Sequence, residues 1–143
     1  MTDVLDRFSP PVREWFQTTF ALPTEAQAQG WPAIANGDHA LILAPTGSGK
    51  TLTAFLWALD RLMTSEVPSP KQRLRVLYVS PLRALAVDVD RNLRAPLRGI
   101  KLAAERGGIP VHEPTVSVRT GDTPPRERQR LQRQPPDILT TTP

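Results

Sequence analysis

The sequence predicts an α/β domain in which a parallel sheet lies between helices. Short apolar runs alternate along the chain with segments whose apolar residues recur at helical spacing. A glycine-rich segment at 44–51 stands between one apolar run and one helical segment. Because parallel strands need crossover connections, which helices normally supply, this alternation favours a parallel sheet.

The first half of the chain is expected to contain helices around one strand. Ser9 is a good N-cap and precedes a proline, so a helix begins after it. A second helix begins at Thr24 and is kinked or interrupted near Pro32. The apolar run at 40–43 predicts a short buried strand, and an apolar stripe within 52–63 predicts the next helix.

The second half of the chain continues the alternation of strands and helices. Strands are expected at 74–79, 116–118 and 138–141, which are rich in β-branched and other apolar residues. A helix is expected at 84–98, where a proline marks its end region, and an arginine-rich helix follows the prolines at 124–125. A solvated face is the favoured interpretation of the arginines at 126, 128, 130 and 133, with a DNA-contacting stripe as the alternative. The segments between the strands are long enough to serve as crossovers.

The segment 44–51 has the sequence of a phosphate-binding loop. Its glycines let backbone N–H groups turn inward around phosphates, and the following helix adds the partial positive charge of its N-terminus. Lys50 is expected to reach the β- and γ-phosphates, and the Thr51 hydroxyl to ligate Mg²⁺. The loop departs from the strict pattern at its first position, which is alanine. The predicted nucleotide-binding residues are Ala44, Pro45, Thr46, Gly47, Ser48, Gly49, Lys50 and Thr51.

Charge is distributed unevenly along the chain. Residues 1–70 contain 4 lysines and arginines against 7 acidic residues, whereas residues 71–143 contain 14 against 7. Most cations of the second half are arginines, which can pair with a phosphate through two N–H groups at once. A basic half beside a nucleotide site indicates a polyanion as partner, most simply a nucleic acid.

Several classes of protein are disfavoured by composition. The chain has no cysteine, so disulfides and thiolate metal sites are excluded. His39 and His112 lie far apart without other ligands at metal spacing, so no metal site formed by side chains alone is expected. No apolar run approaches the roughly twenty residues that a membrane span requires. We therefore expect a cytoplasmic protein without a membrane partner.

A second motif lies upstream of the phosphate-binding loop. The Gln27 amide can both donate to and accept from the edge of adenine, which would favour ATP over GTP. Taken alone, Thr24 could equally be an N-cap and Gln27 a surface residue. Phe8 or Phe16 could stack on the base, although core packing is the favoured interpretation for both rings.

Polar segments follow the strands expected in the second half. Segment 80–85 comes directly after one strand, and ligands of parallel sheets bind outside the carboxyl ends of the strands. Ser80, Arg83 and the N–H groups that open the next helix suit a sugar–phosphate backbone. Segments 119–123 and 140–143 also follow strands, and they offer hydroxyls and free N–H groups on the same edge.

Taken in chain order, these segments resemble the amino-terminal part of the large helicase-related (Lhr) family, within the superfamily 2 helicases of DEAD/DEAH-box type. The resemblance covers nearly the whole chain and is carried by residues 15–16, 23–27, 44–51, 80–85, 119–124 and 135–143. It implies a RecA-like P-loop NTPase fold and an ATP-dependent DNA helicase or translocase that moves 3′ to 5′. The implied cofactors are ATP and Mg²⁺, and the implied partner is single-stranded or partly duplex DNA, with RNA as an alternative and DNA repair as a setting.

The resemblance also assigns roles to particular residues. It places adenine against Gln27, with Thr24 beside it, and the phosphates with Mg²⁺ at Lys50 and Thr51. It places a nucleic-acid strand along Ser80, Pro81, Leu82, Arg83, Gly121, Asp122, Thr142 and Pro143.

The sequence lacks one feature that hydrolysis requires. Helicases of this type hold Mg²⁺ and orient water with adjacent acidic residues, and no two acidic residues are adjacent in this chain. We therefore expect residues 1–143 to be the amino-terminal part of the first RecA-like domain, truncated before that acidic motif. Further domains of the same polypeptide are expected downstream, with a second domain supplying an arginine finger.

Two other functions remain open from the sequence alone. A nucleic-acid-binding module without ATP turnover would explain the basic half and the missing carboxylates. A P-loop kinase of another class would explain the phosphate-binding loop but not segments 80–85 and 140–143.

Overall fold

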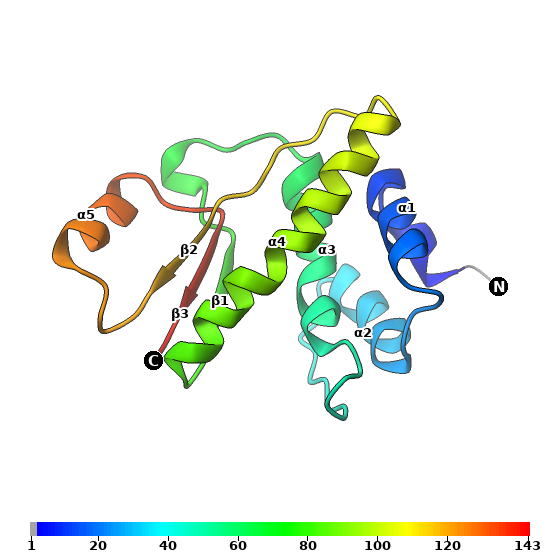
Figure 1. The fold of residues 1–143 in the computed structure, drawn as a ribbon, viewed down its shortest axis with the longest axis horizontal. Coiled ribbons are helices and arrows are strands. Elements are labelled where there is room, and N and C mark those ends of the chain that lie inside the picture. Colours follow the sequence, from blue (N-terminus) through cyan, green and yellow to red (C-terminus); the bar gives the residue numbers. More distant parts are fainter. Residues whose placement is uncertain (1–2) are drawn as a thin grey trace.

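The structure, a computed structural model, describes residues 3–143 (Figure 1). The strands lie on one side of the molecule, α1, α2 and α3 lie on the other, and α4 crosses between them. The helices are α1 (Pro10–Thr19), α2 (Glu25–Ala35), α3 (Lys50–Thr64), α4 (Arg83–Arg106) and α5 (Pro125–Arg133), with 3-10 turns at Val4–Arg7 and Pro70–Gln72. The strands are β1 (Val76–Val79), β2 (Val116–Arg119) and β3 (Ile138–Thr141).

Within residues 3–143, three parallel strands form one sheet in the order β1-β3-β2. Ile138 at the start of β3 is level with Val76 of β1 and with Val116 of β2. The predicted parallel sheet is therefore confirmed, with the last strand of the chain at its centre. Because the strands are parallel and in step, their carboxyl ends meet at one edge of the sheet.

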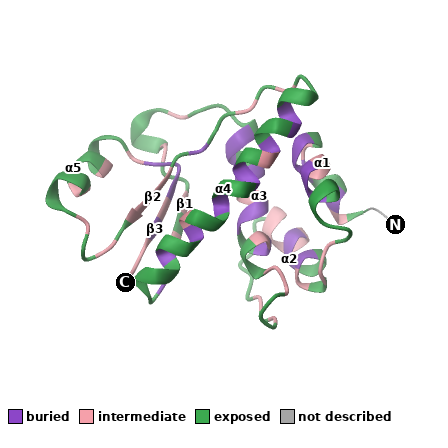
Figure 2. Cartoon of the chain, viewed as in Figure 1, coloured by how far each residue is buried: buried purple, intermediate pink, exposed green. Residues whose placement is uncertain are grey.

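Helix α4 links the sheet to the helical side of the molecule by packing on β2, β3 and α1. Its residues Leu93 and Ile100 are buried, and Figure 2 shows buried residues along the facing sides of α1, α3 and α4. Helices α4 and α1 approach closely at Gly99 of α4, where an added Cβ atom would lie 2.3 Å from the indole of Trp15 on α1. Only glycine leaves room for this contact.

The aromatic rings near the N-terminus pack against one another in the core. Phe8 is 3% exposed and Phe16 is 1% exposed. Their ring centroids lie 4.9 Å and 5.5 Å from that of the buried Trp31, in edge-on geometry. Core packing is thus confirmed for both rings, and neither is available to stack on a base in this structure.

Two helices run past the prolines that were expected to end or interrupt them. Helix α4 continues through Pro96 to Arg106, well beyond the predicted end at residue 98. Pro96 is buried, and the apolar stripe continues beyond it through Ile100, so packing outweighs the hydrogen bond that proline cannot donate. Helix α2 likewise runs through Pro32.

Ser9 stands at the N-cap position of α1, as predicted, but its hydroxyl does not cap that helix. Instead the hydroxyl donates to Asp60, and the backbone N–H of Ser9 donates to the same carboxylate at 2.9 Å. Asp60 lies on α3 and is fully buried, and Arg61 also donates to it at 3.1 Å. A buried carboxylate needs several donors, and this need takes the Ser9 hydroxyl away from its own helix.

The prediction of a buried strand at 40–43 is wrong for this structure. In the part of the chain that the structure describes, these residues pair with no strand, and Leu41 and Leu43 are 84% and 85% exposed. A short apolar run becomes a strand only where a neighbouring strand satisfies its N–H and C=O groups. Ile42 is partly buried and lies next to Gly30 of α2.

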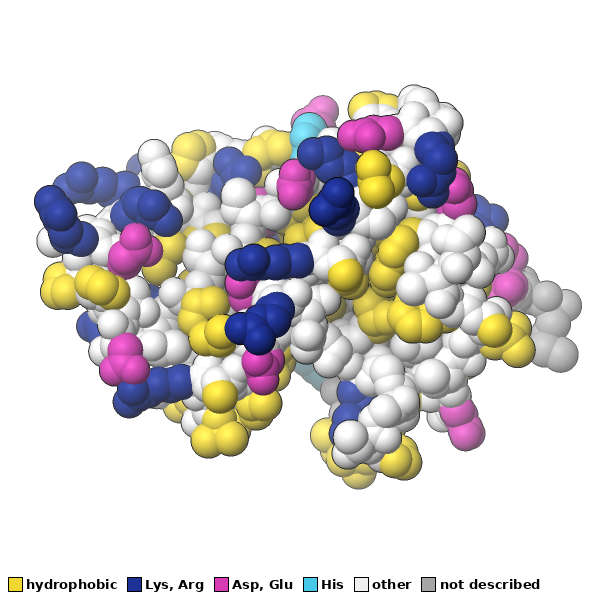
Figure 3. All heavy atoms as spheres, viewed as in Figure 1, with side chains coloured by type: hydrophobic (Ala, Val, Ile, Leu, Met, Phe, Trp, Pro, Cys, Tyr) yellow, Lys and Arg dark blue, Asp and Glu magenta, His cyan; other side chains and the backbone are white. Residues whose placement is uncertain are grey.

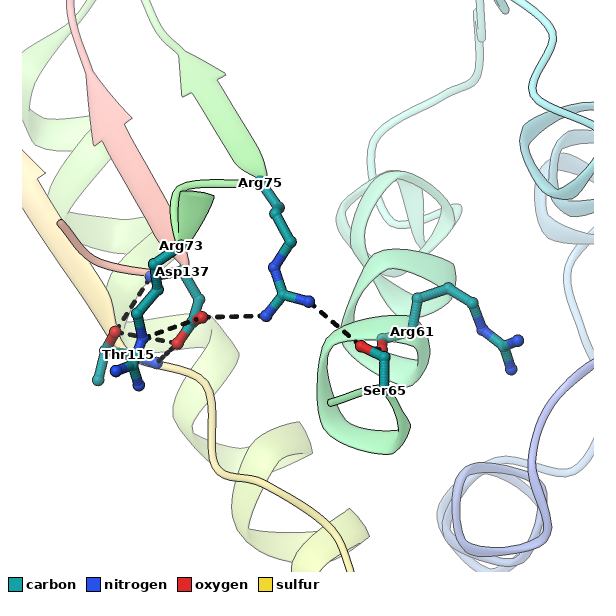
Figure 4. A network of polar contacts seen from close by, with 6 residues as sticks. All are labelled: Arg61, Ser65, Arg73, Arg75, Thr115 and Asp137. Atoms are coloured by element: carbon teal, nitrogen blue, oxygen red, sulfur yellow. Dashed lines mark hydrogen bonds and ion pairs between the residues drawn. The ribbon is translucent and has the colours of Figure 1, made fainter. Parts of the chain in front are cut away.

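Asp137 joins the amino ends of the strands (Figure 4). Its side chain is 4% exposed and accepts hydrogen bonds from the Thr115 backbone at 2.8 Å, from the Thr115 hydroxyl at 3.1 Å and from Arg75 at 3.1 Å. Arg73 donates to it at 3.3 Å. Burial alone would raise the pKa of Asp137, but these hydrogen bonds outweigh burial and hold the pKa below its ordinary value.

We expect Asp137→Asn to lower the free energy of unfolding at pH 7 by about 2 kcal/mol, because it weakens several charge-assisted hydrogen bonds. Since the folded-state pKa lies below the unfolded value near 3.8, the carboxylate stabilises the fold fully above that value. This contribution is lost as the pH falls through the folded-state pKa, so the two variants should converge on acidification.

Urea unfolding of the dilute chain, followed by far-ultraviolet circular dichroism at neutral and acidic pH, measures this difference. Asp38→Asn removes an equal charge from an exposed position and should change stability little at either pH. A difference between wild type and Asp137→Asn that stays constant on acidification would contradict the role given to this carboxylate.

We also expect the isolated chain of residues 1–143 to be marginally stable or prone to aggregate. Leu77 and Val79 on edge strand β1 are 60% and 52% exposed, in addition to the exposed leucines of segment 40–43. An apolar edge strand with unpaired backbone groups is a template for association. Size-exclusion chromatography and thermal unfolding test this expectation, which a sharp, reversible transition at the mass of a monomer would contradict.

Candidate nucleotide and nucleic-acid site

The predicted phosphate-binding loop forms a tight turn that leads directly into α3. Gly47 and Gly49 have φ angles of +83° and +76°, in the left-handed region that favours glycine. The Ser48 backbone N–H donates to the Pro45 carbonyl at 3.2 Å and closes the turn. No side chain of residues 3–143 caps the N-terminus of α3, so its first N–H groups face the open loop.

Lys50 and Thr51 occupy the first two positions of α3, and both are exposed. Their side chains therefore stand beside the uncapped helix N-terminus, at the mouth of the loop. A lysine ammonium, a hydroxyl and convergent N–H groups together suit a phosphate chain and its magnesium ion.

Thr24 and Gln27 attach the start of α2 to the phosphate-binding loop. The Thr24 hydroxyl donates to the Ser48 carbonyl at 2.7 Å, and the Gln27 amide donates to the Gly49 carbonyl at 3.4 Å. The two residues also form a capping box, in which the Gln27 side chain accepts from the Thr24 N–H at 3.0 Å. Gln27 is 3% exposed, so it is not a surface residue.

A hollow of about 450 Å³ opens between the start of α2 and the loop. It is lined by Thr24, Glu25, Ala26, Gln29, Leu43, Ala44, Pro45 and Ser48. The hollow brings together the two segments from which the sequence predicted nucleotide contacts. Its lining combines apolar residues, such as Leu43 and Pro45, with a few polar ones, as is usual for ligand sites.

The other predicted residues meet at the carboxyl edge of the sheet, on the lower side of the view in Figure 1. The Ser80 N–H donates to the Thr141 carbonyl at 2.9 Å and joins the ends of β1 and β3. A small hollow of about 140 Å³ lies beside them, lined by Arg119, Thr120, Gly121, Arg128, Thr141, Thr142 and Pro143. The structure thus brings three separate sequence segments to one edge.

Ser80 differs from its neighbours because it is only 1% exposed. Its hydroxyl accepts from the Leu82 N–H at 3.3 Å and donates to the Leu82 carbonyl at 3.2 Å, which shapes the turn into α4. Pro81, Leu82 and Arg83 are exposed on that turn. Ser80 therefore positions the residues that can reach a ligand.

Arg128 of α5 is part of this edge although the sequence favoured a solvated face for it. Its guanidinium donates to the carbonyls of Thr120 and Gly121 at 3.3 Å and 3.0 Å, so it fixes the loop after β2. The other arginines of that helix follow the expectation, because Arg126, Arg130 and Arg133 are exposed. Figure 3 shows Lys and Arg side chains gathered on the surface over α5. The sequence does contain a sign of this contact. Arg128 follows the turn at Gly121 after only a few residues, so its long side chain can reach back to that turn.

A larger hollow of about 580 Å³ lies at the opposite, amino edge of the sheet, between α5 and the residues around Asp137. It contains none of the predicted site residues. Among residues 3–143, no group of histidine, cysteine, aspartate and glutamate side chains could hold a metal ion, and no helix is long and apolar enough to cross a membrane.

The turn, the helix it opens and the parallel sheet define a P-loop nucleotide-binding protein of RecA-like fold. Residues 24–143 match the family model of the DEAD/DEAH box helicases. The chain therefore belongs to the DEAD/DEAH box helicase family.

Individual relatives agree with this assignment. The chain is 60% identical to the Lhr helicase/probable uracil glycosylase of Mycolicibacterium smegmatis over 99% of its own length, and 51% identical to the Lhr helicase/uracil glycosylase of Escherichia coli over 96%. The resemblance to Lhr helicases is thus confirmed. The chain spans 9% of the length of each of these two relatives.

Solved structures support the fold. The structure of Mycobacterium smegmatis helicase Lhr bound to ssDNA and AMP-PNP matches 99% of this chain with a TM-score of 0.91 at 58% identity, and the match covers 18% of that chain. A hypothetical ATP-dependent RNA helicase from Sulfolobus tokodaii matches 92% of this chain with a TM-score of 0.60 at 22% identity, which supports the fold alone.

The contact between Gly49 and Gln27 yields a stability test. A Cβ atom at Gly49 would lie 2.4 Å from the Gln27 amide nitrogen, so Gly49→Ala should strain the backbone and also break the capping box. Gly37→Ala is a matched control, because Gly37 has a φ of +83° but no atom within 4 Å of the added Cβ. We expect Gly49→Ala to cost about 1–2 kcal/mol more than the control, measured by urea unfolding. An equal loss of unfolding free energy in both variants would contradict the role given to Gln27 in holding the loop.

Proposed function

We propose that this chain binds ATP with Mg²⁺ and a single strand of nucleic acid as part of an ATP-dependent 3′–5′ DNA helicase or translocase. One observation carries the proposal. The phosphate-binding loop and the carboxyl ends of β1, β2 and β3 all lie on the lower side of the view in Figure 1, so one sheet-and-helix unit can hold both a nucleotide and a strand.

In the proposed nucleotide site, the loop N–H groups and Lys50 hold the phosphates, and Thr51 ligates the magnesium ion. The magnesium ion supplies charge neutralisation on the phosphates when it is bound. The base occupies the hollow between α2 and the loop. Gln27 is buried and does not line this hollow, but Thr24, its capping-box partner, does. Gln27 selects adenine by turning its amide from the long, 3.4 Å bond to Gly49 toward the base.

In the proposed strand site, phosphates contact the exposed turn 81–83 and the loops after β2 and β3. Gly121, Thr142 and Pro143 lie around one small hollow there, and Arg128 fixes its shape. The uncapped N-terminus of α4 adds N–H groups that favour an anion. The relative from Mycobacterium smegmatis with the same fold was solved with ssDNA, which supports DNA as the partner.

ATP turnover is proposed for the whole protein and not for residues 1–143 alone. The chain has no adjacent acidic pair to help hold Mg²⁺ and orient water, so these carboxylates and an arginine finger must come from other parts of the polypeptide. The 3′ to 5′ direction and a role in DNA repair are carried over from the resemblance to Lhr helicases, whereas the cytoplasmic location is inferred from the composition of the chain.

The missing acidic pair also favours one alternative, a module that binds nucleic acid without turning over ATP. Such a module would bind DNA through its basic half with strong salt dependence but would ignore ATP. The two proposals therefore differ in whether nucleotide changes strand binding.

Lys50→Ala tests the nucleotide site. In the full-length protein that carries this chain, we expect ATP affinity to fall by about tenfold to a hundredfold, because a charge-assisted contact to phosphate is lost. The exposed Lys50 makes no core contact, so the thermal transition should stay unchanged. Titration with a fluorescent ATP analogue measures the affinity.

Lys71→Ala removes an equal charge from the exposed 3-10 turn at Pro70–Gln72 and serves as the control. Unchanged ATP affinity in Lys50→Ala, or an equal loss in both variants, would reject the proposed nucleotide site. DNA binding that is retained while ATP has no effect in the wild type would favour the module without turnover.

A further inference from the structure

Two of the predicted strand contacts are bound to each other. Arg83, the first residue of α4, forms an ion pair and hydrogen bond with the Asp122 carboxylate in the loop after β2. The side chains are 62% and 71% exposed, so the pair stands in solvent at the carboxyl edge of the sheet. The pair spans the gap between the two segments along which the strand is proposed to run.

The loop that carries Asp122 does not depend on this ion pair for its shape. The Thr120 N–H donates to the Thr123 hydroxyl at 2.8 Å, and the Asp122 N–H donates to the Thr120 hydroxyl at 3.3 Å. Arg128 holds the carbonyls of the same loop from α5. The Asp122 carboxylate can therefore leave Arg83 without unfolding its own loop.

A carboxylate is an unsuitable direct ligand for a phosphodiester because both are anions. It is, however, a good substitute for one, since carboxylate and phosphate oxygens accept the same guanidinium hydrogen bonds. Arg83 is the cation of the exposed turn 81–83 and stands at the uncapped start of α4. Asp122 thus occupies the arginine that a phosphate would otherwise bind.

We propose that Asp122 is a positioning residue that holds Arg83 when no nucleic acid is bound and is displaced by a backbone phosphate of the incoming strand. This proposal rests on the proposed function and deepens it. Asp122 lowers the affinity of the edge for nucleic acid, because every phosphate that reaches Arg83 must first replace the carboxylate. Exposed ion pairs are weak, so the replacement is fast and reversible.

The decisive variant is Asp122→Asn in the full-length protein that carries this chain. Asparagine keeps the size of the side chain and removes the competing charge. We expect the affinity for a fluorescent single-stranded oligothymidylate to rise by about twofold to fivefold, as the weakness of an exposed pair allows. The slope of log affinity against log salt should steepen by up to about one, because one more cation is free to neutralise a phosphate.

Asp90→Asn is the matched control. Asp90 lies farther along α4 and pairs with Arg94 at 3.2 Å, so this variant also removes one acidic charge from an arginine pair, although the Asp90 side chain is 23% exposed and Arg94 is 76% exposed. It should leave both affinity and salt slope close to the wild-type values. An equal gain in Asp90→Asn would mean that net charge alone strengthens binding, and it would overturn the proposal.

Combination with Arg83→Gln makes the test specific. Arg83→Gln alone should weaken strand binding, and adding Asp122→Asn should then have no effect, because the carboxylate has no arginine to occupy. A gain that persists in the double variant would place the effect of Asp122 elsewhere and overturn the proposal. Weaker binding by Asp122→Asn alone would do the same, since it would show that the carboxylate supports the strand.

The failure of this proposal can be distinguished from failure of the proposed function. If the wild-type protein binds the oligonucleotide but Asp122→Asn binds it equally, only the role of Asp122 is rejected. If the wild-type protein does not bind the oligonucleotide at all, the strand site is rejected and Asp122 loses its role with it. The circular dichroism spectra of the variants at Arg83 and Asp122 should match that of the wild type, because the side chains of Arg83 and Asp122 are exposed.

Discussion

The buried carboxylate of Asp137 fixes where the strands begin and therefore where they end. It accepts bonds from residues just before β1 and β2 while it directly precedes β3, so all strands start level. Strands of equal length that start level also finish level, which brings the turn at Ser80, the loop at Gly121 and the segment at Thr142 to one edge. The candidate strand site thus depends on an interaction at the opposite edge of the sheet.

The phosphate-binding loop is supported in a different way. Its neighbours on the N-terminal side, residues 40–43, do not belong to the sheet, so strand pairing does not hold the loop in place. Thr24 and Gln27 hold it instead, through bonds to two of its carbonyl groups. Because these two residues also cap α2, the geometry of the nucleotide site depends on the first turn of that helix. A change in that turn would therefore shift the loop and the position of Lys50.

Local signals were enough to predict much of this architecture from the sequence. Glycine spacing placed the loop before Lys50, helical spacing placed the apolar face of α3, and the order of segments implied a parallel sheet. Long-range effects decided the rest. Segment 40–43 has the composition of a strand but pairs with no strand among residues 3–143, and α4 passes Pro96 because tertiary packing outweighs one lost hydrogen bond. The contact of Arg128 with the Gly121 loop is short in sequence, but the charge pattern of α5 does not reveal it.

The placement of aromatic residues has a spectroscopic consequence. Trp15 rests on Gly99, and Trp31 and Trp57 lie around Phe8, so indole emission reports on the helical side of the molecule. The single tyrosine of the chain, Tyr78, lies in β1 and touches Phe55 of α3. The tyrosine signal therefore observes the contact between β1 and α3, whereas the tryptophan signal observes the helical side, and comparing them during unfolding reveals whether this contact is lost before the helices melt.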